Sequence, residues 1–112
     1  MLEGSCHCGG VRLQVPHPPG SVTDCNCSIC RRLGALWAYY PSAEVAITPI
    51  DATETYIWGD RTLAIHRCKI CGCTTHWQGL GDHAQRVGVN ARMLDPEAWQ
   101  TATVRKINGA TR

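Results

Sequence analysis

The stretch Cys68-Lys69-Ile70-Cys71-Gly72-Cys73 decides the fold of this chain, because it places two cysteines three positions apart. Two intervening residues let both sulfurs bind one ion while the amides between them point at sulfur, and Gly72 can adopt a positive φ at little cost. The spacing from Cys68 to Cys71 is typical of a zinc knuckle. Structural zinc takes four tetrahedral ligands, so this cluster needs cysteines from elsewhere in the chain.

Two further clusters contain all the remaining cysteines, Cys6-His7-Cys8-Gly9 and Cys25-Asn26-Cys27-Ser28-Ile29-Cys30. Eight thiolates can fill two all-cysteine sites, and no single cluster can complete a site alone. The sites must therefore join distant segments, and the free energy of metal binding becomes free energy of folding. Zinc is favoured, although iron in a rubredoxin-type site uses the same knuckles and is not excluded by ligand type and geometry.

The length and composition predict one small domain over residues 1–112. The chain is 44% hydrophobic but contains no Phe, three Tyr and four Trp, so its core must be aliphatic and modest. A domain with so thin a core commonly depends on disulfides or metal for its stability. The eight cysteines supply that stabilisation.

Charge and targeting signals point to a cytoplasmic protein. The formal net charge is +2 and the eleven Lys and Arg are scattered, which gives no indication of nucleic-acid or membrane binding. The N-terminus lacks the pattern of a signal peptide, and no apolar stretch approaches the roughly 18 to 20 residues that cross a bilayer. In a reducing compartment clustered cysteines are metal ligands before they are disulfides. The alternative is a secreted disulfide scaffold whose signal has been removed.

The rest of the sequence predicts an all-β or β-dominated domain with at most short helical turns. Short β-prone runs are separated by Gly, Pro, Asp or Asn, and they span residues 11–15, 36–40, 45–47, 53–58, 63–67, 74–78, 86–89 and 101–107. One or two helical turns fit residues 28–33 before Gly34, and another turn can start at Asp95. We expect the last residues, 108–112, to be frayed.

At the three cysteine clusters the chain resembles the glutathione-dependent formaldehyde-activating enzyme family, which includes the carboxy-terminal domain of centromere protein V. The matching blocks are residues 4–11, 25–32 and 68–72. Their order, their spacing and the strands between them agree with the family over nearly the whole chain. The resemblance implies a β-tent, in which zinc brings antiparallel sheets together.

Carried over position by position, the resemblance implies two zinc ions per chain. The structural zinc is expected on four cysteines of the first and third clusters: Cys6, Cys8, Cys68 and Cys71. The catalytic zinc is expected on Cys25, Cys27 and Cys30. Cys73 departs from the family pattern, and it either closes the second site or stays free. The distinction matters because three protein ligands leave a position open for substrate, whereas four cysteines usually make a structural site.

The activity that the resemblance implies is that of a zinc-dependent carbon-sulfur lyase, which forms or cleaves the S-hydroxymethyl adduct of glutathione and formaldehyde. Zinc suits this chemistry because it holds a thiolate at neutral pH and can polarise an aldehyde. The expected partner is a small thiol such as glutathione or its aldehyde adduct, and a small adduct is the safer expectation because a short chain has few loops to enclose a tripeptide. One alternative is a non-catalytic zinc module that binds a protein or nucleic acid. Another is methionine sulfoxide reduction, which needs a free nucleophilic cysteine, and Cys73 is the only cysteine that the two zinc sites leave over.

Several other side chains are candidates for the site. Arg31 and Arg32 follow the second cluster and can bind the carboxylate of an anionic thiol, or they can be a solvated helix face. Strand alternation places Trp37 and Tyr39 on one face, where core packing is expected in preference to a pocket. His76 is a candidate proton shuttle, with a hydrogen-bonded structural role as the alternative.

Overall fold

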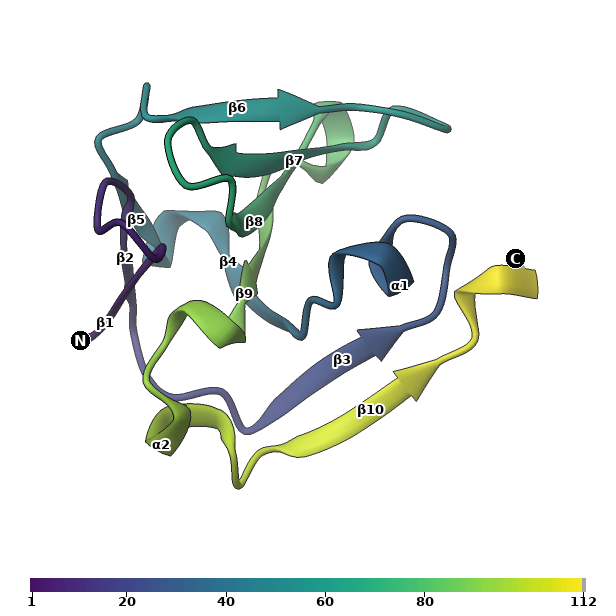
Figure 1. Ribbon diagram of the computed structural model, residues 1–112. Coiled ribbons are helices and arrows are strands. Elements are labelled where there is room, and N and C mark those ends of the chain that lie inside the picture. The colour runs from purple at the N-terminus through teal and green to yellow at the C-terminus, as the bar shows by residue number, and fades with distance from the viewer. Residues whose placement is uncertain (112) are drawn as a thin grey trace.

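Ten strands form two sheets in the computed structural model, which describes residues 1–111 (Figure 1). The smaller sheet is antiparallel and has the order β1 (Leu2–Ser5), β2 (Arg12–Val15), β5 (Ala46–Thr48). The larger sheet has the order β10 (Thr103–Ile107), β3 (Ser21–Cys25), β4 (Trp37–Pro41), β9 (Arg86–Asn90), β8 (Thr74–Gly79), β7 (Leu63–Cys68), β6 (Thr53–Tyr56). Its pairs are antiparallel except that of β10 with β3, which is parallel.

The helices are all single turns, which confirms the predicted β-dominated fold. The two α-helical turns are α1 (Cys30–Leu33) and α2 (Pro96–Trp99), and the 3₁₀ turns are η1 (Ser42–Glu44), η2 (Gly81–His83), η3 (Ala91–Met93) and η4 (Gly109–Thr111). Helix α1 ends at Gly34, whose φ of 66° is left-handed and whose N–H donates to the carbonyl of Cys30. Across residues 1–111 no helix has the length and apolar character needed to cross a membrane.

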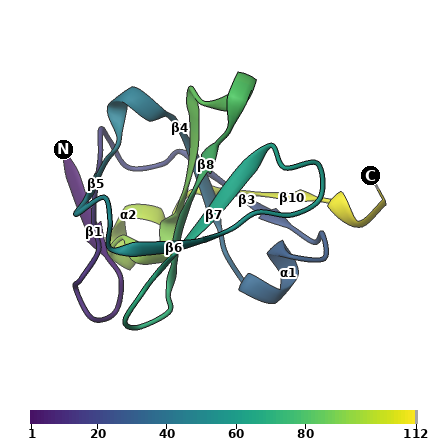
Figure 2. The same cartoon turned by 90° about the horizontal axis from the view of Figure 1, so that it is seen from above.

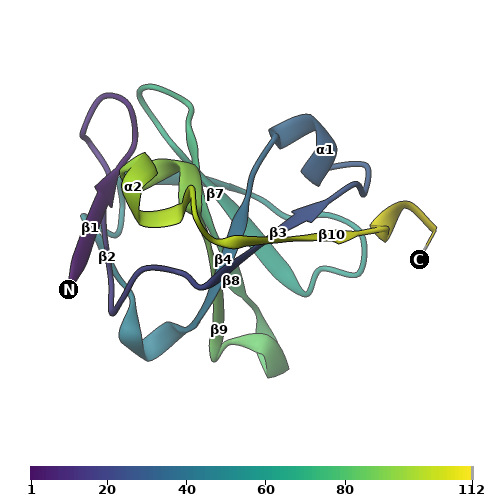
Figure 3. The same ribbon diagram turned by 90° about the horizontal axis from the view of Figure 1, so that it is seen from below.

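Two views of the ribbon place the two ends of the molecule. The three-stranded sheet lies at one end, and α1, the ends of β3 and β10 and the C-terminus lie at the other (Figures 2 and 3). The third cysteine cluster follows β7, and the first follows β1. The second cluster lies between β3 and α1, at the opposite end.

The core is aliphatic, as the composition predicts. Alternation on β2 buries Leu13 and Val15, which pack against Val22, Ala38 and other small aliphatic residues of the larger sheet. A second, smaller cluster contains Ala35, Trp37, Ile65 and Trp77. This second cluster lies beneath the second cysteine cluster and supports the pocket described below.

The sequence analysis missed two strands and was wrong about the C-terminus. Strand β1 contains Gly4, a poor strand former, but a Cβ there would lie 2.6 Å from the Met93 carbonyl oxygen, so the close approach of the chain explains the glycine. Strand β3 is defined by its parallel pairing with the distant β10. Residues 108–111 were expected to be frayed, yet η4 lies against the second cysteine cluster. Arg112 is outside the described residues.

Candidate metal centres and the adjoining pocket

Four cysteines from the first and third clusters converge on one point between the two sheets. The sulfurs of Cys6, Cys8, Cys68 and Cys71 all lie within 4.8 Å of one another. The Sγ–Sγ distance is 3.7 Å from Cys6 to Cys8 and 3.6 Å from Cys8 to Cys68. Bonds of roughly 2.3 Å from zinc to sulfur give a tetrahedral edge of about 3.8 Å, so these donors fit a zinc ion.

Backbone amides prepare this four-cysteine group to carry negative charge. The N–H groups of Gly10 and Val11 donate to the sulfurs of Cys8 and Cys6, each over 3.3 Å. Backbone N–H groups of Cys73 and Cys8 donate to the Cys71 sulfur and lower the pKa of that thiol to about 5. Donor amides of this kind favour thiolates, which are the form that binds metal.

Three cysteines of the second cluster form a separate group. The sulfurs of Cys25, Cys27 and Cys30 lie within 4.8 Å of one another, at the end of β3 and the start of α1. The Cys27 N–H donates to the Cys25 sulfur over 3.5 Å, and the Cys30 N–H donates to the Cys27 sulfur over 3.4 Å. Burial raises the pKa of Cys27, but hydrogen bonds from the Cys30 N–H, from the thiols of Cys30 and Cys25 and from the Ile29 N–H more than offset it, and the net shift is downward.

Two neighbours fix the shape of the three-cysteine group. The indole N–H of Trp37 donates to the Cys30 sulfur over 3.4 Å. On the other side, Gly109 comes so close that an added Cβ would lie 2.7 Å from the Cys25 sulfur. A tetrahedral metal held by these three sulfurs keeps one position for another ligand.

The C-terminal turn belongs to this site, although the sequence analysis did not include it. The Asn26 side chain donates to the Asn108 side chain over 3.1 Å and accepts from the Ala110 N–H over 3.0 Å. These bonds hold Gly109 against the cysteines. The only sequence signal was an asparagine between two ligands and a glycine just after the last strand, and neither indicates contacts across 82 and 84 positions of the chain.

Cys73 is placed beside the four-cysteine group. It packs against Cys6, Val11 and Cys68, and its carbonyl accepts from the Cys68 N–H over 3.0 Å. It is absent from the group of Cys25, Cys27 and Cys30. Of the two alternatives left open by the sequence, this placement favours a Cys73 that stays outside the second site, because the knuckle turn keeps it at the other end of the molecule.

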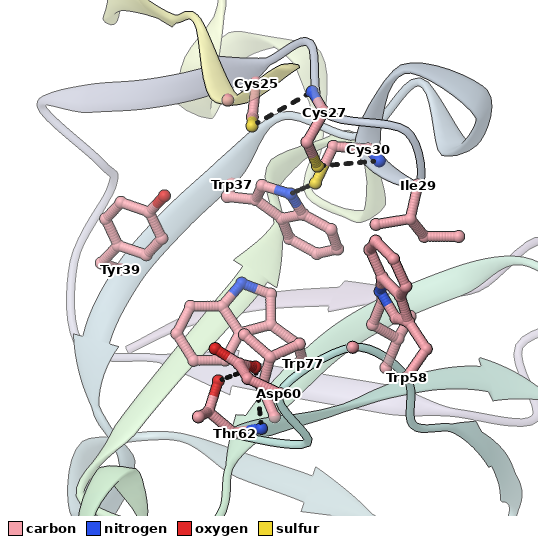
Figure 4. A pocket seen from close by; sticks show the side chains of 14 residues that line it. Cys25, Cys27, Ile29, Cys30, Trp37, Tyr39, Trp58, Asp60, Thr62 and Trp77 are labelled. Atoms are coloured by element: carbon pink, nitrogen blue, oxygen red, sulfur yellow. Dashed lines mark hydrogen bonds between the residues drawn. The ribbon is translucent and has the colours of Figure 1, made fainter. Parts of the chain in front are cut away.

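A pocket opens directly from the three-cysteine group (Figure 4). Its volume is about 510 Å³, which is within the usual range for small-molecule sites. The lining is mainly aromatic and aliphatic, and it includes the polar side chains of Asp60 and Thr62. The lining residues beyond the cysteines are Ile29, Trp37, Tyr39, Trp58, Gly59, Asp60, Thr62, Leu63, Ile65, Trp77 and Gly109. Such a lining suits an organic molecule with a reacting atom at the cysteines.

The strand β4 supplies two of these walls. Alternation does place Trp37 and Tyr39 on the same face, as predicted. Of the two, only Trp37 packs in the core, where it is 2% exposed. Tyr39 is 42% exposed and lines the pocket, with its hydroxyl directed toward the cysteine end in Figure 4. Opposite them, Gly88 leaves the space for the Trp77 ring, since a Cβ there would overlap the indole.

The two arginines proposed from sequence do not line this pocket. Arg31 and Arg32 are exposed on α1, and the Arg32 guanidinium donates to the Ser28 carbonyl over 2.7 Å. This placement matches the alternative of a solvated helix face.

His76 also lies outside the pocket. It is buried, its ring stacks on that of His66 with 4.2 Å between centroids, and its Nδ1 is 2.8 Å from the Thr75 hydroxyl. Burial, and then the neighbouring His66, lower the pKa of His76 to about 3. A histidine that stays neutral and packed in this way fits the structural alternative, and a proton shuttle would need it near the reacting atoms.

A β-fold with two cysteine groups that could each hold a metal, and with a pocket at one of them, defines a class of small cysteine-rich proteins, and comparison with known proteins specifies the family. The chain matches the model of the glutathione-dependent formaldehyde-activating enzyme (GFA) family over residues 1–107, and it belongs to that family.

Two relatives illustrate the range of the similarity. A curated Halomonas elongata protein named "Putative glutathione-dependent formaldehyde-activating enzyme" is 36% identical over 76 residues, which make up 67% of this chain and 45% of that protein. The chain thus aligns with less than half the length of this relative. The crystal structure of a Rhodobacter sphaeroides protein superposes with a TM-score of 0.77 at 29% sequence identity, covering 92% of this chain and 99% of that one.

Proposed function

We propose that this chain is a zinc-dependent carbon-sulfur lyase that forms or cleaves the adduct of a small thiol and an aldehyde, with glutathione and formaldehyde as the expected pair. The observation that carries the proposal is the three-cysteine group at the end of a pocket with a mainly aromatic and aliphatic lining. Three sulfurs are one ligand fewer than a tetrahedral metal takes. Membership of the GFA family supports the choice of substrates.

The donor set of all sulfur atoms suits zinc at both groups. Zinc bound at Cys25, Cys27 and Cys30 would supply a positive charge that favours the thiolate form of a substrate and can polarise an aldehyde oxygen. The second ion, at Cys6, Cys8, Cys68 and Cys71, would act only on the fold, because its four protein ligands leave no open position.

The chain's own residues hold the reacting groups in place. Trp37 keeps Cys30 in position through its indole N–H, and Gly109 closes the side of Cys25. The aromatic walls contact the carbon skeleton of the adduct and keep water from one side of it. The Tyr39 hydroxyl is directed toward the cysteine end, and in this proposal it would exchange a proton with the aldehyde oxygen.

The reaction needs no further co-substrate. In the forward direction the thiol sulfur bonds to the carbonyl carbon, the π electrons move to oxygen, and that oxygen gains the proton that the thiol has lost. In the reverse direction the hydroxyl loses its proton, the carbon-sulfur bond breaks and sulfur keeps the electron pair. A cytoplasmic location, where thiols stay reduced, accords with this chemistry and remains a prediction.

The test is a measurement of exchange between glutathione, formaldehyde and their S-hydroxymethyl adduct by two-dimensional exchange NMR, with and without the zinc-loaded protein. We expect the protein to accelerate exchange and Cys27→Ser to reduce the rate to the uncatalysed one. Cys73→Ser is the matched control, because it also removes one thiol but from outside the three-cysteine group. A folded, zinc-loaded protein that leaves the exchange rate unchanged would support the non-catalytic zinc module instead.

A further inference from the structure

An anionic thiol needs a cation in or beside the pocket. Glutathione carries two carboxylates, and carboxylates are best recognised by arginine through charge-assisted hydrogen bonds. The lining of the pocket next to the three-cysteine group has neither Lys nor Arg, and its one carboxylate, Asp60, has the wrong sign. Arg31 and Arg32 do not line it. A cation for the substrate must therefore come from outside this lining.

A second hollow continues from the pocket and contains such a cation. Its volume is about 260 Å³, and four of its lining residues, Tyr39, Thr62, Leu63 and Trp77, also line the pocket. The remaining two lining residues are His83, which is titratable, and Arg86, which is the cation. The two spaces thus share one wall, with the cysteines at one end and Arg86 beyond the other.

The shared wall also holds the Arg86 side chain. Its Cζ lies 5.6 Å from the centroid of the Tyr39 ring and 5.9 Å from that of the Trp77 ring. Two aromatic faces at these distances attract a guanidinium and restrict where it can lie. The same contacts leave the edge of the guanidinium, with its N–H donors, free to bind a planar anion.

No acidic side chain competes for Arg86. Within residues 1–111 the one ion pair joins Arg67 to Glu54, at the β6 edge of the larger sheet, whereas Arg86 is on its central strand β9. Arg86 is exposed, and its guanidinium lies over the two rings. Its charge is therefore available to a ligand.

We propose that Arg86 is a specificity-determining residue that binds a carboxylate of the thiol substrate, while the sulfur lies at Cys25, Cys27 and Cys30. The inference rests on the proposed function, and it narrows the substrate to thiols that carry a carboxylate remote from sulfur. Tyr39 and Trp77 contact the part of the ligand between its two ends. Arg86 touches no reacting atom, so it affects binding and leaves the chemical step unchanged.

The test compares glutathione with its diethyl ester, which lacks both negative charges, on the zinc-loaded full chain. For Arg86→Gln we expect KM for glutathione to rise roughly tenfold, the effect of losing one charge-assisted contact, with kcat nearly unchanged. The diethyl ester should have the same KM in the wild type and the variant. Arg86→Lys should recover part of the loss, because a lysine keeps the charge without the planar fork. Arg31→Gln removes an equal charge outside the pocket and should change nothing.

Binding measured without turnover separates this inference from the lyase proposal. Glutathione titrated against the zinc-loaded chain should quench or shift the fluorescence of the pocket tryptophans, with a Kd roughly tenfold higher in Arg86→Gln. If glutathione binds in this Arg86-dependent way but its exchange is not accelerated, the inference stands and the lyase proposal fails. An equal loss for glutathione and its ester, a loss in Arg31→Gln alone, or no glutathione binding would overturn the role of Arg86.

Discussion

The two cysteine groups differ in how far apart their ligands lie in the sequence. In the four-cysteine group the 3.6 Å contact between Cys8 and Cys68 joins residues 60 positions apart, and it links the end of β1 to the end of β7 in the other sheet. In the three-cysteine group all ligands lie between Cys25 and Cys30. A metal that closes a long loop removes much conformational freedom from the unfolded chain, whereas one held by a short segment removes little.

Their surroundings differ in the same sense. Cys6 and Cys68 are each 2% exposed and pack in a small hydrophobic cluster with Val11. Cys25, Cys27 and Cys30 are all half-buried and border the pocket. On the proposed function, one group would therefore hold the two sheets together and the other would meet a ligand.

The largest expected effect is on stability, from Cys6→Ser. Losing this ligand breaks the link between the sheets, so we expect at least about 3 kcal/mol of destabilisation, comparable with loss of a disulfide in a small domain. For a domain of this size that corresponds to roughly 10 °C or more in Tm. Thermal unfolding followed by circular dichroism measures it, and Cys73→Ser is the control that should lower Tm far less. A melting temperature unchanged by Cys6→Ser would refute the assigned role of this group.

The reverse pattern is expected for Cys27→Ser. Exchange activity should fall to the uncatalysed rate, while the fold and the metal of the four-cysteine group remain. We expect the stability to change by about 1 kcal/mol, the usual size for a single substitution. Activity, Tm and zinc content of one preparation test this together. Global unfolding of Cys27→Ser would mean that both groups are structural.

A smaller effect is expected from Gly109→Ala, which tests the part played by the C-terminal turn. The added Cβ would lie 2.7 Å from the Cys25 sulfur, so either the turn or the cysteine must move. We expect the zinc affinity of the three-cysteine group to fall roughly tenfold, as for other changes next to metal ligands. Competition with a chromogenic chelator measures this affinity. Gly20→Ala has open space around its Cβ and is the matched control; equal affinities in the two variants would remove Gly109 from the site.

The smallest effect is expected from Trp37→Phe. This change deletes the N–H that donates to the Cys30 sulfur but keeps an aromatic ring in the core. The zinc affinity of the three-cysteine group should fall a few-fold, which is less than the roughly 10- to 100-fold typical of outer-shell partners, because the aromatic ring stays in place. Trp77→Phe removes an indole N–H from the same cluster without touching a cysteine sulfur, and it should leave the affinity unchanged. Equal losses in both variants would attribute the effect to packing.

The cysteine spacing predicted more of the molecule than any other part of the sequence. The ligand set of the four-cysteine group, which followed from resemblance to the family, matches the convergence of Cys6, Cys8, Cys68 and Cys71. Most strands followed from alternation and turn residues. Strand β1 did not, because Gly4 is explained only by the carbonyl of Met93 that packs against it.

The pocket was harder to predict because its parts meet only in three dimensions. Trp58 comes from the loop between β6 and β7, Trp77 from β8 and Gly109 from η4, and none of them carries a motif. Proximity in sequence suggested Arg31 and Arg32 as substrate cations, but both side chains are exposed on α1 and outside the pocket. Arg86 lies 56 positions after Cys30, and only the pairing of β9 with β4 and β8 brings it to the wall that Tyr39 and Trp77 form.

The difference between the two groups is tested most directly by native mass spectrometry of the reduced, freshly purified chain, counting zinc during stepwise addition of a chelator and then of glutathione. We expect two zinc ions at the start, loss of one while the charge-state distribution stays that of a folded protein, and a glutathione complex that forms with the two-zinc species only. Simultaneous loss of both ions with unfolding, or two ions indifferent to glutathione, would contradict a closed structural group paired with an open, exchangeable one.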